Sequence, residues 1–166
     1  PWAERAICHV LWIQGIQAKD SGDFAQSEAH LREVIARQQR IAEESGKAQP
    51  HACGPLLTLG AILHCQGKTG LALTYYQESL DHAWRFHVAG TATVTAARIA
   101  GMLATHGRWQ EAAWLFGAIE AYCDKLGISF AAPVWRLTRA FGLPQPWQGE
   151  PTFTGQTAVM WEATRR

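Results

Sequence analysis

The chain has 166 residues, of which 48% are hydrophobic and 17% charged, and its formal net charge is +1. This length suits one domain or one section of a repeat array, and the apolar content suffices for a continuous core. No apolar run is long enough to span a bilayer, so we expect no membrane contact. Because the sequence starts at Pro1 without methionine, we expect it to be part of a longer protein.

The 15 basic and 14 acidic residues are scattered along the chain. Glu28 and Arg32, and likewise Glu33 and Arg37, stand four residues apart, which is the spacing of ion pairs on a solvated helix face. This charge pattern predicts no direct contact of the chain with nucleic acid.

Helical spacing of apolar residues predicts a first helix over residues 2–20 and a second over residues 24–45, with a turn at Gly22 between them. We expect Trp2 and Ile7 to face the second helix.

A third helix is expected to run to about Gln66 and a fourth to about His87. Gly90 and Thr91 resemble a helix stop followed by an N-cap, so a fifth helix is expected from there to Thr105. A sixth is expected over residues 108–126. The large aromatic residues of this region are expected to fill the core: Trp84, Trp109 and Trp114.

Beyond Gly127, Pro133 suits the first turn of a seventh helix over residues 133–141. Residues 142–156 contain six glycines and prolines, which exclude a helix. We expect this tail to be held by Trp147, and a last short helix over residues 156–165.

The turns at Gly22, Gly67 and Gly107 share one pattern and lie 45 and then 40 residues apart. Seven residues before each turn stands a small residue, which lets the two helices of a hairpin approach closely. Nine residues after each turn stands a large one, which we expect to fill the space against the neighbouring hairpin. The small residues are Gly15, Gly60 and Ala100, and the large ones are Leu31, Tyr76 and Phe116. Helical hairpins at such a spacing are typical of an α-solenoid.

This pattern resembles the tetratricopeptide repeat, with a period longer than the usual ~34 residues. The segment from Ala112 to Gly127, followed by Pro133, is similar to the end of the repeat region in large bacterial LuxR-type and related ATPase-linked transcriptional regulators. The resemblance implies a right-handed α-solenoid of three hairpins with a capping helix over residues 1–141, followed by an irregular tail over residues 142–166. It also implies a role in signalling within such a regulator.

No catalytic residues, metal site or cofactor are expected. Gln66-Gly67-Lys68-Thr69 lacks the first glycine of a phosphate-binding loop, since Ile62 stands at that position. His51 and Cys53 are separated from His64 and Cys65 by a helix of roughly 16 Å, too long for one ion to bridge. All four cysteines are expected to be free thiols in a cytoplasmic protein.

We therefore expect a non-catalytic module that binds a protein or peptide in a concave groove formed by the first helix of each hairpin. The alternative is a sensor domain that binds a metabolite or sugar in that groove; an elongated groove favours the first and a closed pocket at Trp12 the second. A homo-oligomer is compatible with either. The residues expected to line the groove are His9, Trp12, Ile16, Lys19, Leu57, Ala61, His64, Val94, Ala97, Gly101 and Thr105.

Overall fold

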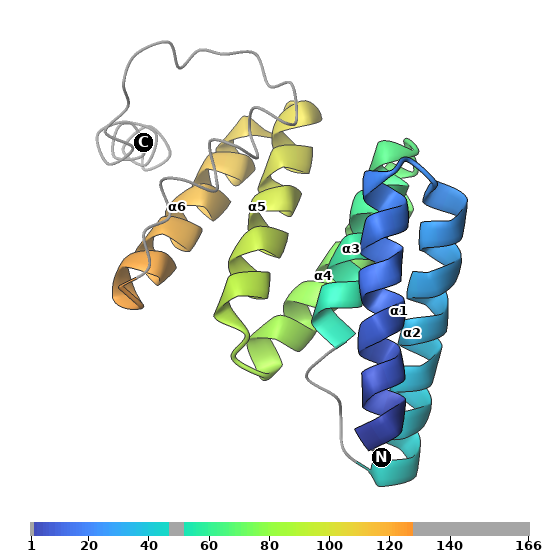
Figure 1. Cartoon of the computed structure of the whole chain (residues 1–166). Helices are drawn as coiled ribbons and strands as arrows, with labels where there is room; N and C mark the ends of the chain where they lie inside the picture. Colours follow the sequence, from blue (N-terminus) through green and yellow to red (C-terminus); the bar gives the residue numbers. More distant parts are fainter. Residues whose placement is uncertain (1, 47–51, 128–166) are drawn as a thin grey trace. The chain divides into compact units, whose positions relative to one another are not determined.

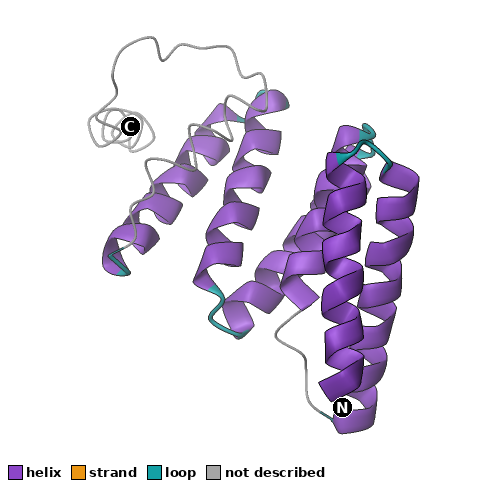
Figure 2. Ribbon diagram, in the orientation of Figure 1, coloured by secondary structure: helices purple, strands orange, loops and turns teal. Residues whose placement is uncertain are grey.

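The computed structural model describes residues 2–46 and 52–127, and all of its regular structure there is helical (Figures 1 and 2). The described residues form six helices: α1 (Trp2–Asp20), α2 (Phe24–Ser45), α3 (Cys53–Cys65), α4 (Thr69–Arg85), α5 (Ala89–Thr105) and α6 (Trp109–Lys125). The expected all-α class is confirmed. The predicted seventh helix, the tail and the boundary at residue 141 lie outside the described residues.

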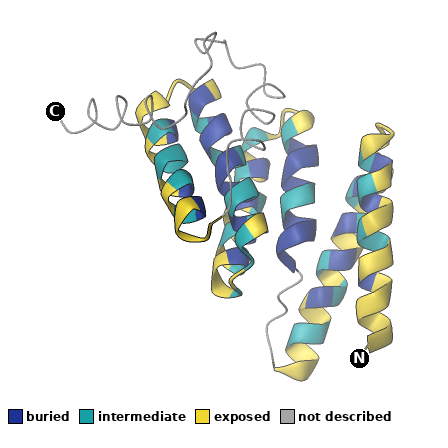
Figure 3. Cartoon of the chain, turned by 60° about the vertical axis from the view of Figure 1, so that its left-hand side comes forward, coloured by how far each residue is buried: buried dark blue, intermediate teal, exposed yellow. Residues whose placement is uncertain are grey.

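The chain divides into two compact units, residues 1–95 and 96–166, so the division falls inside α5. In the first unit, α1 packs against α2 and α3 packs against α4, while α3 also contacts α2 and, less extensively, α1. Most of α3 is buried (Figure 3), in keeping with its nearly uninterrupted apolar sequence. The second unit contains the rest of α5 together with α6.

Close approach at two glycines explains how the hairpins of the first unit pack. A Cβ placed on Gly15 would lie 3.1 Å from Cγ of Leu31, and one placed on Gly60 would lie 2.7 Å from the ring of Tyr76. Leu31 and Tyr76 are fully buried. The predicted close approach of two helices at Gly15 and at Gly60 is therefore confirmed. Leu31 and Tyr76, which we expected against the neighbouring hairpin, lie against the glycine of their own hairpin. Ala100 is buried as well.

Each of four turns places its middle residue in the left-handed region, at Gly22, Gly67, His87 and Gly107. In each, the amide of the following residue donates to a carbonyl five residues earlier, as from Lys68 to Leu63 at 2.9 Å. The turn at His87 was expected three residues later, at Gly90, because no glycine marks position 87. With it, the turns at 67, 87 and 107 are evenly spaced by 20 residues.

The turn at His87 corrects the expected start of α5. The helix begins at Ala89, so Gly90 and Thr91 lie in its first turn rather than before it. The amide of Val88 closes the turn on the carbonyl of Ala83 at 2.8 Å. Ala83 and Ala92 then form a small core with Cys53, Leu80 and Val88.

Several tryptophans expected inside are exposed, and Trp84, Trp109 and Trp114 do not fill the core. On α4 the buried positions are 72, 76, 79 and 83. Trp84 follows Ala83 by one residue and is turned about 100° away from that row.

The same one-residue displacement occurs on α1. The predicted inward face of α1 was wrong at Trp2 and Ile7, which are exposed, whereas Cys8, the neighbour of Ile7, is buried.

Candidate functional site

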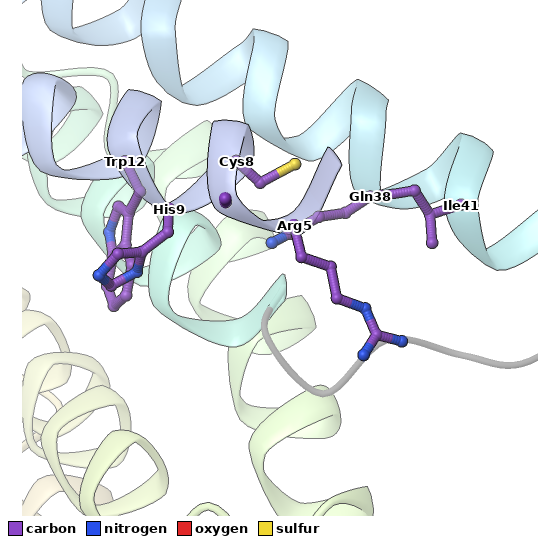
Figure 4. Close-up of a pocket in the computed structure, with 7 residues that line it drawn as sticks. Arg5, Cys8, His9, Trp12, Gln38 and Ile41 are labelled. Carbon is purple, nitrogen blue, oxygen red and sulfur yellow. The ribbon is translucent and has the colours of Figure 1, made fainter. Parts of the chain in front are cut away.

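A cavity of about 370 Å³ lies between α1 and α2 in the first unit. The residues that line it come from consecutive turns of α1 and from one turn of α2, because side chains three and four residues apart share a helix face. Figure 4 shows His9 and Trp12 together at one end, Arg5 and Ile41 toward the other, and Cys8 and Gln38 between them.

Trp12 forms a fixed wall of this cavity. Its indole N–H donates to Oγ1 of Thr58 on α3 at 3.3 Å, and the Thr58 hydroxyl donates in turn to the carbonyl of Gly54 at 3.0 Å. The ring covers Gly54 so closely that a Cβ there would lie 2.5 Å from Cζ2 of Trp12. The ring of Trp12 therefore packs on the start of α3.

The ring of His9 meets Trp12 edge-on, with 6.0 Å between ring centroids and 71° between planes. Since His9 itself is exposed, it extends the aromatic wall toward solvent. Two of the predicted binding residues are thus brought together by the structure.

The remaining predicted residues do not line the cavity. Ile16, Leu57 and His64 are half-buried elsewhere in the first unit. Lys19 forms an ion pair with Asp20. Thr105 belongs to the second unit, where its hydroxyl donates to the carbonyl of Met102 at 2.9 Å.

Several small residues that we expected to line an open groove are not exposed. Ala61, Ala97 and Gly101 are buried, and Val94 is half-buried. Small side chains there serve packing and leave no open surface at those positions.

Cys8 forms part of the cavity wall but is not suited to act as a nucleophile. Burial raises the pKa of the Cys8 thiol, and the nearby Arg37 guanidinium opposes that shift only in part. A thiol with a raised pKa is protonated at neutral pH, whereas nucleophilic attack requires the thiolate. None of the four cysteines, all of which lie in the described residues, takes part in a disulfide bond there.

A second hollow, of about 280 Å³, lies among α2, α3 and α4. Its cation, Arg32, donates to Glu28 on its own helix and to the hydroxyl of Tyr75 at 3.2 Å. Because that guanidinium already donates to two protein groups, this hollow is a weaker candidate for a ligand site than the cavity at Trp12.

Sequence reasoning missed Arg5 and Gln38 as lining residues. Helix periodicity places Arg5 on the same face as His9 and Trp12, so a signal for it existed. Gln38 lies on the next helix, and only the packing of α2 on α1 brings it to the cavity.

Within residues 2–46 and 52–127, no three His, Cys, Asp or Glu side chains are grouped so that they could hold a metal ion. In the same residues, no helix is both long and apolar enough to cross a membrane. No family model, no curated protein and no solved structure matches this chain.

Proposed function

We propose that this chain is a non-catalytic, small-ligand-binding module of a larger cytoplasmic bacterial transcriptional regulator. The observation that carries the proposal is the cavity at Trp12. Its volume of about 370 Å³ falls within the range of small-molecule sites, and its mixture of apolar walls and a few polar groups is typical of them. A partly enclosed pocket at Trp12 favours a sensor over a module that binds an elongated peptide.

The proposed architecture is a right-handed α-solenoid of tetratricopeptide-like hairpins. Two local features support this proposal. Residues with a left-handed backbone conformation recur at positions 67, 87 and 107. Gly15 also packs closely against Leu31, and Gly60 packs in the same way against Tyr76. Repeats of this kind stack helix pairs and present the first helix of each pair to ligands. In this arrangement a ligand held on α1 is placed to influence how neighbouring repeats pack.

The test is a screen of small apolar compounds by protein-detected NMR. Compounds that bind are expected to shift the indole N–H signal of Trp12 and to bind less tightly to His9→Ala and Trp12→Ala. Trp84→Ala is the matched control, because it removes an indole that is 64% exposed and lies outside the cavity. Compounds that bind Trp12→Ala and His9→Ala as tightly as the unaltered chain would show that the cavity is not the site.

A protein or peptide partner is the second candidate function. It is favoured by a row of exposed apolar side chains on α1, formed by Ile7, Val10 and Ile13, since exposed apolar patches often mark protein contacts. Val10→Glu is expected to abolish such a contact while leaving binding in the cavity intact. Unchanged binding of a protein partner by Val10→Glu would contradict this second candidate.

A further inference from the structure

Helices α1 and α3 are the first helices of successive hairpins, and their surfaces can be compared residue by residue. The close-packed glycines of the two helices, Gly15 and Gly60, lie 45 residues apart, and so do the left-handed turns that follow them. Each residue of α1 therefore corresponds to the residue of α3 that stands 45 positions later. Cys8 and Cys53, for example, correspond to each other, and both are 4% exposed.

One row of residues on α3 is buried where the preceding hairpin packs. Its members stand three or four positions apart and so share one side of the helix, and all are buried: Ala52, Pro55, Leu59 and Ile62. The helix α2 packs on α3, and Leu59 lines the same hollow as Ile35 and Ala36 of α2. The second helix of the first hairpin therefore lies over this row.

The start of α5 repeats this arrangement. The first two residues of the α3 row correspond, 40 positions later, to Ala92 and Thr95 of α5, and both are buried. Ala92 belongs to the small core that contains Ala83 of α4, and Oγ1 of Thr95 lies 3.3 Å from Oγ of Ser79 on α4. In two places, therefore, the second helix of one hairpin covers the same row on the first helix of the next.

The corresponding row on α1 is open. It consists of Ile7, Val10, Gln14 and Gln17, which stand 45 positions before the members of the α3 row, and we call these four residues the α1 row. Val10 is 53% exposed, Ile7 is 42% exposed and both glutamines are exposed; Figure 3 shows much of α1 exposed. None of the four is charged, and none lines the cavity at Trp12. The α1 row is therefore a separate surface, apolar over its first half and amide-bearing over its second.

We propose that the α1 row binds an amphipathic α-helix of a helical hairpin from outside these 166 residues, in the way that α3 binds α2. The facing side of that helix is uncharged, because a charge placed against the row would lose its hydration without gaining a partner. Apolar side chains are needed opposite Ile7 and Val10, and hydrogen-bonding side chains opposite Gln14 and Gln17. The proposal rests on the second candidate function, whose partner it specifies, and it is independent of ligand binding in the cavity.

The partner hairpin must differ from the α1–α2 hairpin at one position. The ring of Trp12 packs on Gly54, where a Cβ would lie 2.5 Å from Cζ2 of that ring. The α1 residue that corresponds to Gly54 is His9, whose side chain would occupy the same space. The partner therefore carries a side chain smaller than tryptophan at the position equivalent to Trp12.

A second copy of this chain is a less suitable occupant. In head-to-tail stacking its α6 would take the place that α4 has on α5. The α6 residues that correspond to Ser79 and Ala83 are Ile119 and Cys123, and both are already buried within one chain. The positions that such a contact would use are therefore not free on α6.

The experiment measures how accessible the α1 row is, by the rate at which a thiol reagent modifies Val10→Cys. Cys65→Ser removes the exposed native thiol, and the other three cysteines are buried. The whole 166-residue chain is compared with an extended chain in which residues 1–51 are repeated ahead of Trp2. The repeated hairpin supplies a second α2 as the probe, and it carries Trp12→Leu so that it leaves space for His9.

In the extended chain the thiol of Val10→Cys is expected to react about tenfold more slowly, which requires the covered state to be favoured by only about 1.4 kcal/mol. Asp20→Cys is the matched control on α1: it corresponds to Cys65 of α3, which stays exposed, so its rate should be the same in both chains. In the repeated copy, Ile35→Glu is expected to restore the fast reaction of Val10→Cys. Arg40→Glu, at an exposed position of α2 outside the hollow beside Leu59, should not.

Equally fast modification of Val10→Cys in both chains, whether or not the helix content rises, would overturn the proposal, because the row would then not accept a helix as α3 does. Equal slowing of Asp20→Cys would also overturn it, by placing the added hairpin elsewhere. If Val10→Cys already reacts slowly in the 166-residue chain and faster upon dilution, a second copy occupies the row and the assignment to an outside hairpin is wrong. None of these outcomes bears on the cavity, which the NMR screen tests separately.

Discussion

The aromatic ring of Tyr76 occupies the space that a side chain on Gly60 would need. A Cβ at Gly60 would lie 2.7 Å from both Cδ1 and Cε1 of Tyr76 and 3.3 Å from the carbonyl oxygen of Ala72. Both residues are buried, and Tyr76 is completely inaccessible to solvent. The ring has no solvent-facing space into which it could move.

We therefore expect Gly60→Leu to destabilise the chain by about 1–3 kcal/mol or more, the usual cost of overpacking a core. The measurement is chemical unfolding followed by circular dichroism. Gly70→Ala is the control, because Gly70 lies in α4 and has nothing within 4 Å of its Cβ direction. Its stability should stay the same or rise slightly. A Gly60→Leu chain as stable as the original would mean that α3 and α4 do not meet at this point.

A second prediction concerns His87, which has a φ of 55° where the equivalent turns have glycine. A side chain in the left-handed region costs about 1–2 kcal/mol, and glycine removes that cost while adding some freedom to the unfolded chain. We expect His87→Gly to raise the free energy of unfolding by about 0.5–1 kcal/mol.

The reciprocal change, Gly67→Ala, is the control for His87→Gly. Since Gly67 has a φ of 74°, alanine there should lower stability by about 1 kcal/mol. We therefore expect the free energy of unfolding to rise in His87→Gly and to fall in Gly67→Ala. A loss of stability in both would show that the His87 side chain contributes more than its backbone strain costs.

The sequence was sufficient to predict the helices and the close helix contacts at Gly15 and Gly60. A small residue at a fixed distance from a glycine turn indicates directly where two helices can approach each other. The sequence failed at His87, where the same turn is formed without glycine. The predicted burial of Trp84 was also wrong, because a displacement of one residue turns a side chain about 100° around a helix.

The candidate site was less predictable than the fold. His9 and Trp12 were identified because they share one helix. Gln38 was not, because the cavity forms only when α2 packs on α1.

A third prediction follows from the unmet oxygen of Gln38. Because Oε1 is buried without a partner among the described residues, an apolar side chain of similar size removes a desolvation cost of about 1–3 kcal/mol. We expect Gln38→Leu to unfold at a higher denaturant concentration than the original chain when no ligand is present. A loss of stability would indicate that the Gln38 amide is already satisfied in the free protein.

A fourth prediction concerns thiol reactivity. Cys65 is exposed, whereas Cys8, Cys53 and Cys123 are buried, and burial raises the pKa of the Cys8 and Cys123 thiols. At neutral pH we expect a thiol reagent to modify Cys65 first and the other three only upon unfolding. Cys65→Ser should abolish the fast phase of the reaction. A fast phase that persists in Cys65→Ser would mean that a buried thiol is accessible in solution.

The last prediction links the Glu28–Arg32 pair to pH. Arg32 donates to Glu28 at 2.8 Å and 3.0 Å, and this hydrogen bonding lowers the pKa of Glu28 below its ordinary value. A carboxyl group whose pKa is lowered by folding stabilises the fold above its ordinary pKa, and that contribution disappears as the pH falls through the folded-state pKa.

Because the Arg32 side chain is 50% exposed and the Glu28 side chain 21% exposed, solvent screens the pair, and its expected contribution is only about 0.3–0.5 kcal/mol. Glu28→Gln should therefore cost about that much at pH 7 and nothing at a pH below both pKa values. Glu43→Gln, which removes an exposed carboxylate of the same helix that forms no ion pair with a described residue, is the control. A cost for Glu28→Gln that is the same at both pH values would show that Glu28 acts through packing and not through its charge.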